Sequence, residues 1–111
     1  MILVNCTPHD INLYLADGFV IALESRCVAR AKQTNRWIGN ADLEGSYIPI
    51  VAAEYGEPID LPDPEDGTLF IVSALTAAAA PDRKDLVGTT DLVRDEAGRI
   101  IGAKALVKFN N

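Results

Sequence analysis

The chain has little of what most catalytic sites are built from. Its 111 residues include one histidine, His9, one tryptophan, Trp37, and two cysteines, Cys6 and Cys27. It contains neither a Gly-x-Gly-x-x-Gly sequence nor a Walker phosphate loop. A zinc site needs three or four ligands, and the chain has no Cys-x-x-Cys pair and no second histidine. We therefore expect no metal, no cofactor and no catalytic residue.

Long apolar runs and an export signal are also lacking. No run approaches the ~18 residues that span a bilayer, so we expect no membrane association. The first residues, Met-Ile-Leu-Val-Asn-Cys, have no basic segment followed by a long apolar one, so we expect no signal peptide. Two cysteines do not make a disulfide framework, and the default for both is a free thiol in a reducing cytoplasm.

The net charge of −6 is concentrated in one segment. Residues 51–70 hold six acidic residues and no basic one, whereas the rest of the chain is nearly balanced. Such a chain should repel long nucleic acid. A small anionic ligand remains possible where basic residues gather, above all in residues 26–36, which contain three arginines and a lysine and no acid.

Two hairpins are predicted, one near each end. Residues 11–16 and 19–24 alternate around Asp17-Gly18, a strong signal for a tight hairpin turn. Residues 86–94 and 99–109 flank a second turn sequence that ends at Gly98.

The middle of the chain is less regular. Residues 26–33 alternate like a strand, residues 35–46 have the glycines and asparagines of a loop, and residues 47–53 form another apolar strand. The acidic, proline-rich residues 54–67 cannot form a central strand. We expect them along a sheet edge, with Ile59 and Leu61 pointing inward.

Residues 67–81 combine a buried strand with a helix. Leu69 to Val72 is an unbroken apolar run, which suits a strand covered on both faces. Ser73 can cap a helix over Ala74 to Ala80, which Pro81 ends. We expect this strand to be central, and an anion could bind where it meets the helix.

The sum predicts an α+β, β-rich fold. We expect a mixed, mainly antiparallel sheet with one short helix, in a single compact domain over residues 1–111, with a small β-barrel as the alternative.

Candidate binding residues come from the turns and the basic segments. His9 lies in a turn between strands, where it either has a structural role or donates to a ligand oxygen. Arginines can hold phosphates, and Trp37 can stack on a base. The site needs these groups to reach one rim, directly or through a second subunit. The candidates are Thr7, His9, Ser73, Arg83 and Arg94, followed by Arg30 and Trp37.

The segment Asn5-Cys-Thr-Pro-His-Asp-Ile11 resembles the opening Asn-Leu-Thr-Pro-His-x-Ile of small proteins encoded by tailed bacteriophages and prophages. The likeness continues through most of the chain, including Gly67-Thr-Leu-Phe-Ile-Val-Ser-Ala-Leu75 and Leu92-Val-Arg-Asp-Glu-Ala-Gly-Arg-Ile-Ile-Gly102. Cys6 departs from the usual leucine. The resemblance implies a viral accessory protein in the host bacterial cytoplasm, without established catalytic residues.

The chain is also similar in type to phage proteins that sequester nucleotide-derived immune signals of the host. This similarity implies a homo-oligomer that binds a small anionic, nucleotide-like ligand without turning it over. The alternative hypothesis is a protein-interaction or virion-structural module that uses the acidic residues 54–66. A small hydrolase or nuclease is the least favoured reading, because the chain has one histidine and no metal cluster.

Overall fold

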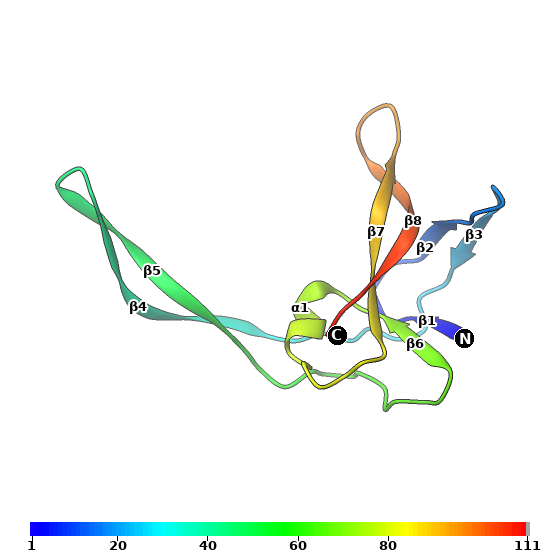
Figure 1. The fold of residues 1–111 in the computed structure, drawn as a ribbon, viewed down its shortest axis with the longest axis horizontal. Coiled ribbons are helices and arrows are strands. Elements are labelled where there is room, and N and C mark those ends of the chain that lie inside the picture. Colours follow the sequence, from blue (N-terminus) through cyan, green and yellow to red (C-terminus); the bar gives the residue numbers. More distant parts are fainter. Residues whose placement is uncertain (111) are drawn as a thin grey trace.

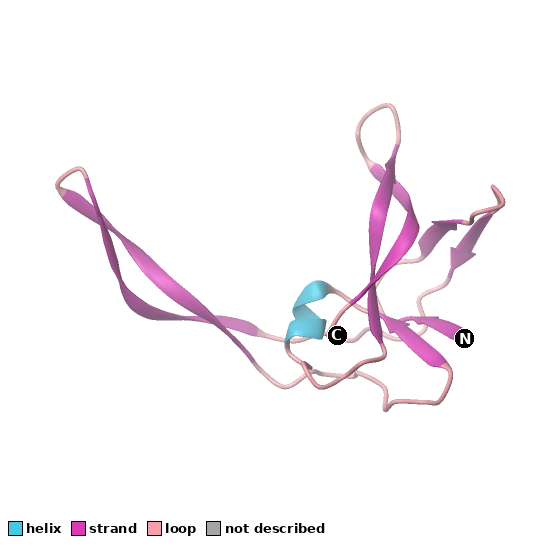
Figure 2. Ribbon diagram, viewed as in Figure 1, coloured by secondary structure: helices cyan, strands magenta, loops and turns pink. Residues whose placement is uncertain are grey.

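The fold is α+β and β-rich, as the sequence predicts. A computed structural model describes residues 1–110, which form eight strands and one short helix (Figures 1 and 2). No helix in this part of the chain is long and apolar enough to cross a membrane. The elements are β1 (Ile2–Asn5), β2 (Ile11–Tyr14), β3 (Val20–Leu23), β4 (Gln33–Leu43), β5 (Ser46–Tyr55), β6 (Thr68–Ile71), α1 (Ala74–Ala78), β7 (Leu86–Arg94) and β8 (Ile100–Lys108).

The strands form one mixed sheet and one separate ribbon. The sheet has the order β1-β6-β7-β8-β2-β3, and β4 and β5 pair only with each other. Three pairs are parallel: β1–β6, β6–β7 and the short contact between β2 and β8. The antiparallel pairs β2–β3, β4–β5 and β7–β8 contain most of the paired residues. The predicted mixed, mainly antiparallel arrangement is confirmed.

Both predicted hairpins are present. The β2–β3 turn closes with a hydrogen bond from the Leu15 N–H to the Phe19 carbonyl, at 2.8 Å, and Gly18 has a φ of 95°. The β7–β8 turn closes with a bond from the Asp95 N–H to the Arg99 carbonyl, at 2.9 Å. Glycine adopts such a left-handed φ without the steric cost of a side chain, which is why the sequence predicts both turns.

The large sheet curls, so that its two ends meet. The strands β1 and β3 are its edges, but Asn5 of β1 forms an isolated parallel bridge with Ser25, just after β3. The N–H of Arg26 also donates to the Asn5 carbonyl at 2.9 Å. This closure gives the sheet the barrel-like character of the alternative prediction.

The strand–helix unit forms as predicted. Strand β6 lies inside the sheet, between β1 and β7. Phe70 and Ile71 in β6, and Val72 just after it, are each at most 3% exposed. The Ser73 hydroxyl caps α1 by accepting a hydrogen bond from the Thr76 N–H at 3.2 Å. The helix ends at Ala78, slightly earlier than expected.

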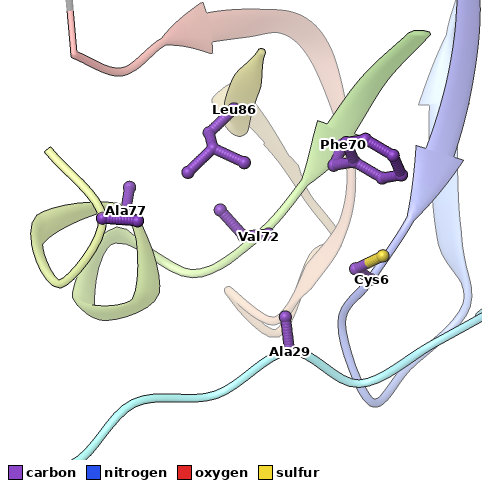
Figure 3. Packing of buried hydrophobic residues seen from close by; sticks show 7 residues of the cluster. Cys6, Ala29, Phe70, Val72, Ala77 and Leu86 are labelled. Carbon is purple, nitrogen blue, oxygen red and sulfur yellow. The ribbon is translucent and has the colours of Figure 1, made fainter. Parts of the chain in front are cut away.

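The core lies between this unit and its neighbours. Phe70, Val72, Leu86 and Ala77 gather in one cluster, with Cys6 and Ala29 at its side (Figure 3). Leu61 packs against the cluster, as predicted, but Ile59 is 50% exposed. The acidic segment therefore has one inward apolar residue and not two.

Two predictions for the middle of the chain are wrong. Residues 26–32 lie in no strand and have one isolated bridge, from Arg30 to Ile59, and Gln33 is the first residue of β4. Residues 35–46 are not a loop, because most of them belong to β4. Gly45 forms the turn after β4, and Gly39 follows a bulge within the strand, so the glycines mark local features of a hairpin.

The β4–β5 hairpin (residues 33–55), which we call the arm, projects from the rest of the molecule (Figure 1). The longest dimension of the molecule is 57 Å, and its radius of gyration is 17.5 Å. A compact domain of this length would have a radius of gyration of about 13 Å. The predicted strand 47–53 lies in the arm as part of β5, and Pro49 is tolerated there because both arm strands have a free edge.

The expectation of free thiols is wrong. Cys6 and Cys27 form a disulfide, and their Cα atoms are 4.4 Å apart. Cys6 follows β1 directly, and the Asn5–Ser25 bridge brings Cys27 beside it. This proximity comes from the closure of the sheet, which the cysteine spacing alone could not reveal.

The disulfide should stabilise the fold measurably. It closes a loop with a sequence separation of 21 residues. Loop-closure entropy then predicts that reduction lowers the free energy of unfolding by about 3 kcal/mol. Urea unfolding with and without a reductant measures the change. The double variant Cys6→Ala/Cys27→Ala is the control and should not respond to the reductant, whereas an unchanged wild-type midpoint would contradict the prediction.

Candidate ligand-binding site

A pocket opens where β1 and β6 end. The two strands are parallel, and Asn5 lies opposite Ile71 in the last pair of their register. The chain therefore leaves the sheet at the same edge after each strand, at Thr7 and at Ser73. The carboxyl ends of parallel strands are a common place for ligand sites.

The pocket has a volume of about 550 Å³. This volume lies within the ~300–1,000 Å³ range of small-molecule sites. Three predicted site residues, Thr7, Ser73 and Arg30, are among its walls. The complete lining is Cys6, Thr7, Pro8, Val28, Ala29, Arg30, Ala31, Ser73, Leu75 and Thr76.

The first wall is the turn at Thr7, which Asn5 holds in place. The Asn5 side chain is fully buried, and its amide nitrogen donates to the carbonyls of His9, at 2.8 Å, and Leu23, at 3.0 Å. Its amide oxygen accepts from the Thr7 N–H at 3.0 Å and from the Thr7 hydroxyl at 2.7 Å. The Thr7 hydroxyl proton is thus engaged inside the protein, which leaves the oxygen lone pairs for a ligand donor.

The second wall is the start of α1. The Ser73 hydroxyl donates to the Thr76 hydroxyl oxygen at 3.0 Å, and Thr76 is fully buried. The Thr76 hydroxyl in turn donates to the Ala29 carbonyl at 3.4 Å. A helix of only five residues adds few aligned peptide dipoles, so Ser73 acts as a helix cap and the helix contributes little charge to the pocket.

The third wall carries the charge. Arg30 is exposed, and its backbone is fixed by two hydrogen bonds with Ile59, of 3.0 Å and 2.7 Å. The guanidinium has no ion-pair partner among residues 1–110. Arg30 is the only charged residue that lines this pocket, so the pocket favours an anion.

The other four predicted residues lie elsewhere in a single chain. His9 is exposed in the turn beside the pocket, and only its carbonyl is hydrogen-bonded among the described residues. Arg83 lines a different hollow, near Pro58 and Leu61. Arg94 donates to the Gly98 carbonyl at the β7–β8 turn, at 2.9 Å, and Trp37 lies on the arm.

Sequence reasoning missed the residues that complete the pocket. Thr76 was read only as part of a helix, although its spacing from Ser73 matches a cap contact. Val28, Ala29 and Ala31 lie in residues 26–33, which the sequence predicts as a strand. No sequence signal placed them beside Ser73, because that contact depends on the closure of the sheet.

The disulfide excludes thiol chemistry at Cys6 and Cys27. As a disulfide, neither Cys6 nor Cys27 has a thiolate to act as a nucleophile or as a zinc ligand. Within residues 1–110, no three side chains of histidine, cysteine, aspartate or glutamate gather where a metal ion could bind.

Arg83 has a structural contact in place of a pocket position. Its guanidinium donates two hydrogen bonds to the Asp85 carboxylate, at 2.9 Å and 2.8 Å, and lies 5.9 Å from the centre of the Phe70 ring. The bond from Arg83 lowers the pKa of Asp85 below its ordinary value of 3.8. Arg83 therefore ties the segment after α1 to the core.

We predict that Asn5→Ala lowers the free energy of unfolding by on the order of 3 kcal/mol. The change leaves the carbonyl of Leu23 and the N–H of Thr7 without their partner, and it leaves the carbonyl of His9 with only the bond from the Thr7 hydroxyl, at 3.1 Å. Asn12→Ala is the matched control, because Asn12 is exposed and its side chain donates only one bond, to the Ile101 carbonyl at 3.1 Å. It should cost less than about 1 kcal/mol. Equal losses in urea unfolding would contradict the role of Asn5.

The Arg83–Asp85 pair predicts a pH-dependent stability. Because the folded pKa of Asp85 is depressed, its contribution is present above the unfolded pKa and is lost as the pH falls through the folded one. Arg83→Gln should therefore lower the stability most at neutral pH, and the difference from wild type should shrink below pH 3.8. Asp82→Asn, at an exposed neighbour, is the control. A difference between Arg83→Gln and wild type that stays constant with pH would contradict the prediction.

Comparison with known proteins adds no relative. No family model, no curated protein and no solved structure matches the chain. The function therefore has to be argued from the chemistry of the pocket and from the surfaces of the molecule.

Proposed function

We propose that the protein is a phage-encoded accessory protein that binds a small anionic, nucleotide-like ligand in the host cytoplasm and sequesters it without catalysis. The observation that carries this proposal is Arg30, a cation without an ion-pair partner among residues 1–110, on the wall of a pocket of about 550 Å³ whose other lining residues are uncharged. We take the ligand class from phage proteins that sequester nucleotide-derived immune signals, because the chain is similar to those proteins in type.

The walls of the pocket fit the parts of such a ligand. Pro8, Val28 and Leu75 offer apolar surface to a base or a ribose. Arg30 offers paired N–H donors to a phosphate. The hydroxyls of Thr7 and Ser73 donate within the protein, so their lone pairs are suited to the N–H groups of a base. These three kinds of contact support a nucleotide over a simple inorganic anion.

The chemistry at the pocket supports binding over turnover. The pocket's lining residues include no histidine and no carboxylate, so neither its hydroxyls nor Cys6 has a general base beside it. A hydroxyl without such a base is a weak nucleophile at neutral pH.

The disulfide bears on where the protein acts. Disulfides persist in oxidising compartments and are reduced in most cytoplasms. Because Cys6 lines the pocket, the cytoplasmic form would present a thiol there. Binding assays should therefore include both the oxidised and the reduced protein.

The alternative function, a protein-interaction or virion module, rests on the acidic residues 54–66. Glu54 pairs with Arg36, but the other acids of the segment have no ion pair within residues 1–110. These are Glu57, Asp60, Asp63, Glu65 and Asp66. The negative charges of these side chains are therefore available to a partner, and the partner of such a module would be a protein with a cationic surface.

Calorimetry against cyclic dinucleotides and ADP-ribose derivatives tests the ligand proposal. We expect at least one to bind far tighter than 1 mM, which corresponds to about −4 kcal/mol. Arg30→Gln should weaken that binding by about tenfold or more, since it removes a charged contact to phosphate. Arg26→Gln is the matched control, because Arg26 is exposed and does not line the pocket. The absence of binding, or equal effects of the two variants, would overturn the proposal.

A second experiment on the nucleotide that binds separates a binder from an enzyme. After long incubation and denaturation of the protein, mass spectrometry should recover the bound nucleotide unchanged. A cleaved or altered product would show turnover and contradict the non-catalytic role.

A further inference from the structure

We propose that the arm is an interface with a second copy of this chain, and that its apolar face around Ile48 and Ile50 is covered in a homodimer. This assigns a surface and a partner that the ligand proposal does not include, and it does not depend on ligand binding. Four observations lead to it: the isolation of the arm, its composition, its area and a receiving groove on the same chain.

No other strand among residues 1–110 supports the arm. Its two strands pair only with each other, and it projects away from the large sheet (Figure 1). An isolated two-stranded ribbon is marginally stable in water, because neither face is covered. A ribbon with 11 residues in one strand and 10 in the other therefore needs another surface against it.

Both faces of the arm are apolar. Side chains alternate along β5, so Ile48 and Ile50 lie on one face while Tyr47 and Val51 lie on the other. Trp37 is cross-strand to Val51 and shares its face. The exposed fractions are 61% for Trp37, 64% for Tyr47 and 54% for Ile48. Contiguous exposed apolar surface of this kind marks an interaction site.

Few charges oppose the burial of the arm. From Trp37 to Ala53 the only charged residues are Asp42 and Glu44, both at the turn. Docking along the middle of the arm would thus remove no charge of the arm itself from water, which avoids a large part of the cost of forming an interface.

The area of the arm suits a dimer. Strand β4 has 11 residues, which at the usual rise gives a length of about 36 Å. Two strands have a width of about 10 Å, so one face presents on the order of 350 Å². If each arm of a dimer covers a face of that size on its partner, the four surfaces total about 1,400 Å². This falls inside the ~1,200–2,000 Å² of stable interfaces.

A receiving surface lies on the same chain. A groove of about 340 Å³ runs between β2 and the β7–β8 hairpin. Ile11, Leu92, Ile100 and Ile101 give it apolar walls, and Asp10, Asn12 and Thr89 also line it. Ile100 is 55% exposed and Leu92 is 42% exposed. Within residues 1–110, each chain thus has one apolar ribbon and one largely apolar groove without a partner. A two-fold axis would satisfy both features twice, which favours a second copy over a different protein.

Sedimentation equilibrium of the full wild-type chain at tens of micromolar tests the proposal. We expect a species of twice the 11.9 kDa chain mass. Ile50→Lys should weaken self-association at least tenfold, because it places a charge in the middle of the buried face. Ile2→Lys is the matched control: this isoleucine is 64% exposed on the edge strand β1 and lies outside the arm and the groove.

A wild-type chain that stays monomeric, or equal effects of the two lysine variants, would overturn the proposal. Hydrogen exchange gives a second test that needs no variant. Arm amides should be protected at high concentration and lose protection on dilution, while the amides of β7 and β8 keep theirs. Protection of the arm in a monomer, or its absence at every concentration, would also overturn the proposal.

Discussion

The buried amide of Asn5 is the contact on which the architecture depends. It is the only fully buried asparagine among the described residues, and its side chain makes four hydrogen bonds. Two of them reach the carbonyls of His9, shortly before β2, and of Leu23, the last residue of β3. Its own carbonyl accepts from Arg26. One side chain thus joins the first strand of the sheet to the last, where an unpaired polar group would be costly.

The pocket is a consequence of this closure. Asn5 shapes the turn at Thr7, and the same closure brings Cys27 to Cys6 and places residues 28–31 against the start of α1. Those residues have no continuous strand pairing, yet the disulfide, the Arg30–Ile59 bridge and the contact from Thr76 to Ala29 fix their path. The wall formed by residues 28–31, which carries the charge of Arg30, is therefore held by side chains and single bridges.

The predictable parts of the fold are those that local chemistry determines. Asp17-Gly18 and Gly98 specified two turns, and the run Leu69–Val72 followed by Ser73 specified a buried strand and a capped helix. Strand β4 of the arm escaped prediction because Gly39 and Asn40 resemble loop residues, and no core imposes a burial pattern on it. The pocket was half predictable. The parallel register of β1 and β6 brings Thr7 and Ser73 together, whereas Arg83 and Arg94 are engaged locally with Asp85 and Gly98.

The base of the arm is continuous with the charged wall of the pocket, which links the two proposals physically. The segment 28–31, which forms the charged wall of the pocket, ends at Ala31, and β4 begins two residues later, at Gln33. Between them, the Lys32 carbonyl accepts from the Gly56 N–H at 2.8 Å, directly after β5 ends. The Arg30–Ile59 bonds continue this pairing toward the pocket. Any partner surface that orders the arm therefore also restrains the backbone of Arg30, and a pre-positioned arginine loses less entropy when it binds an anion.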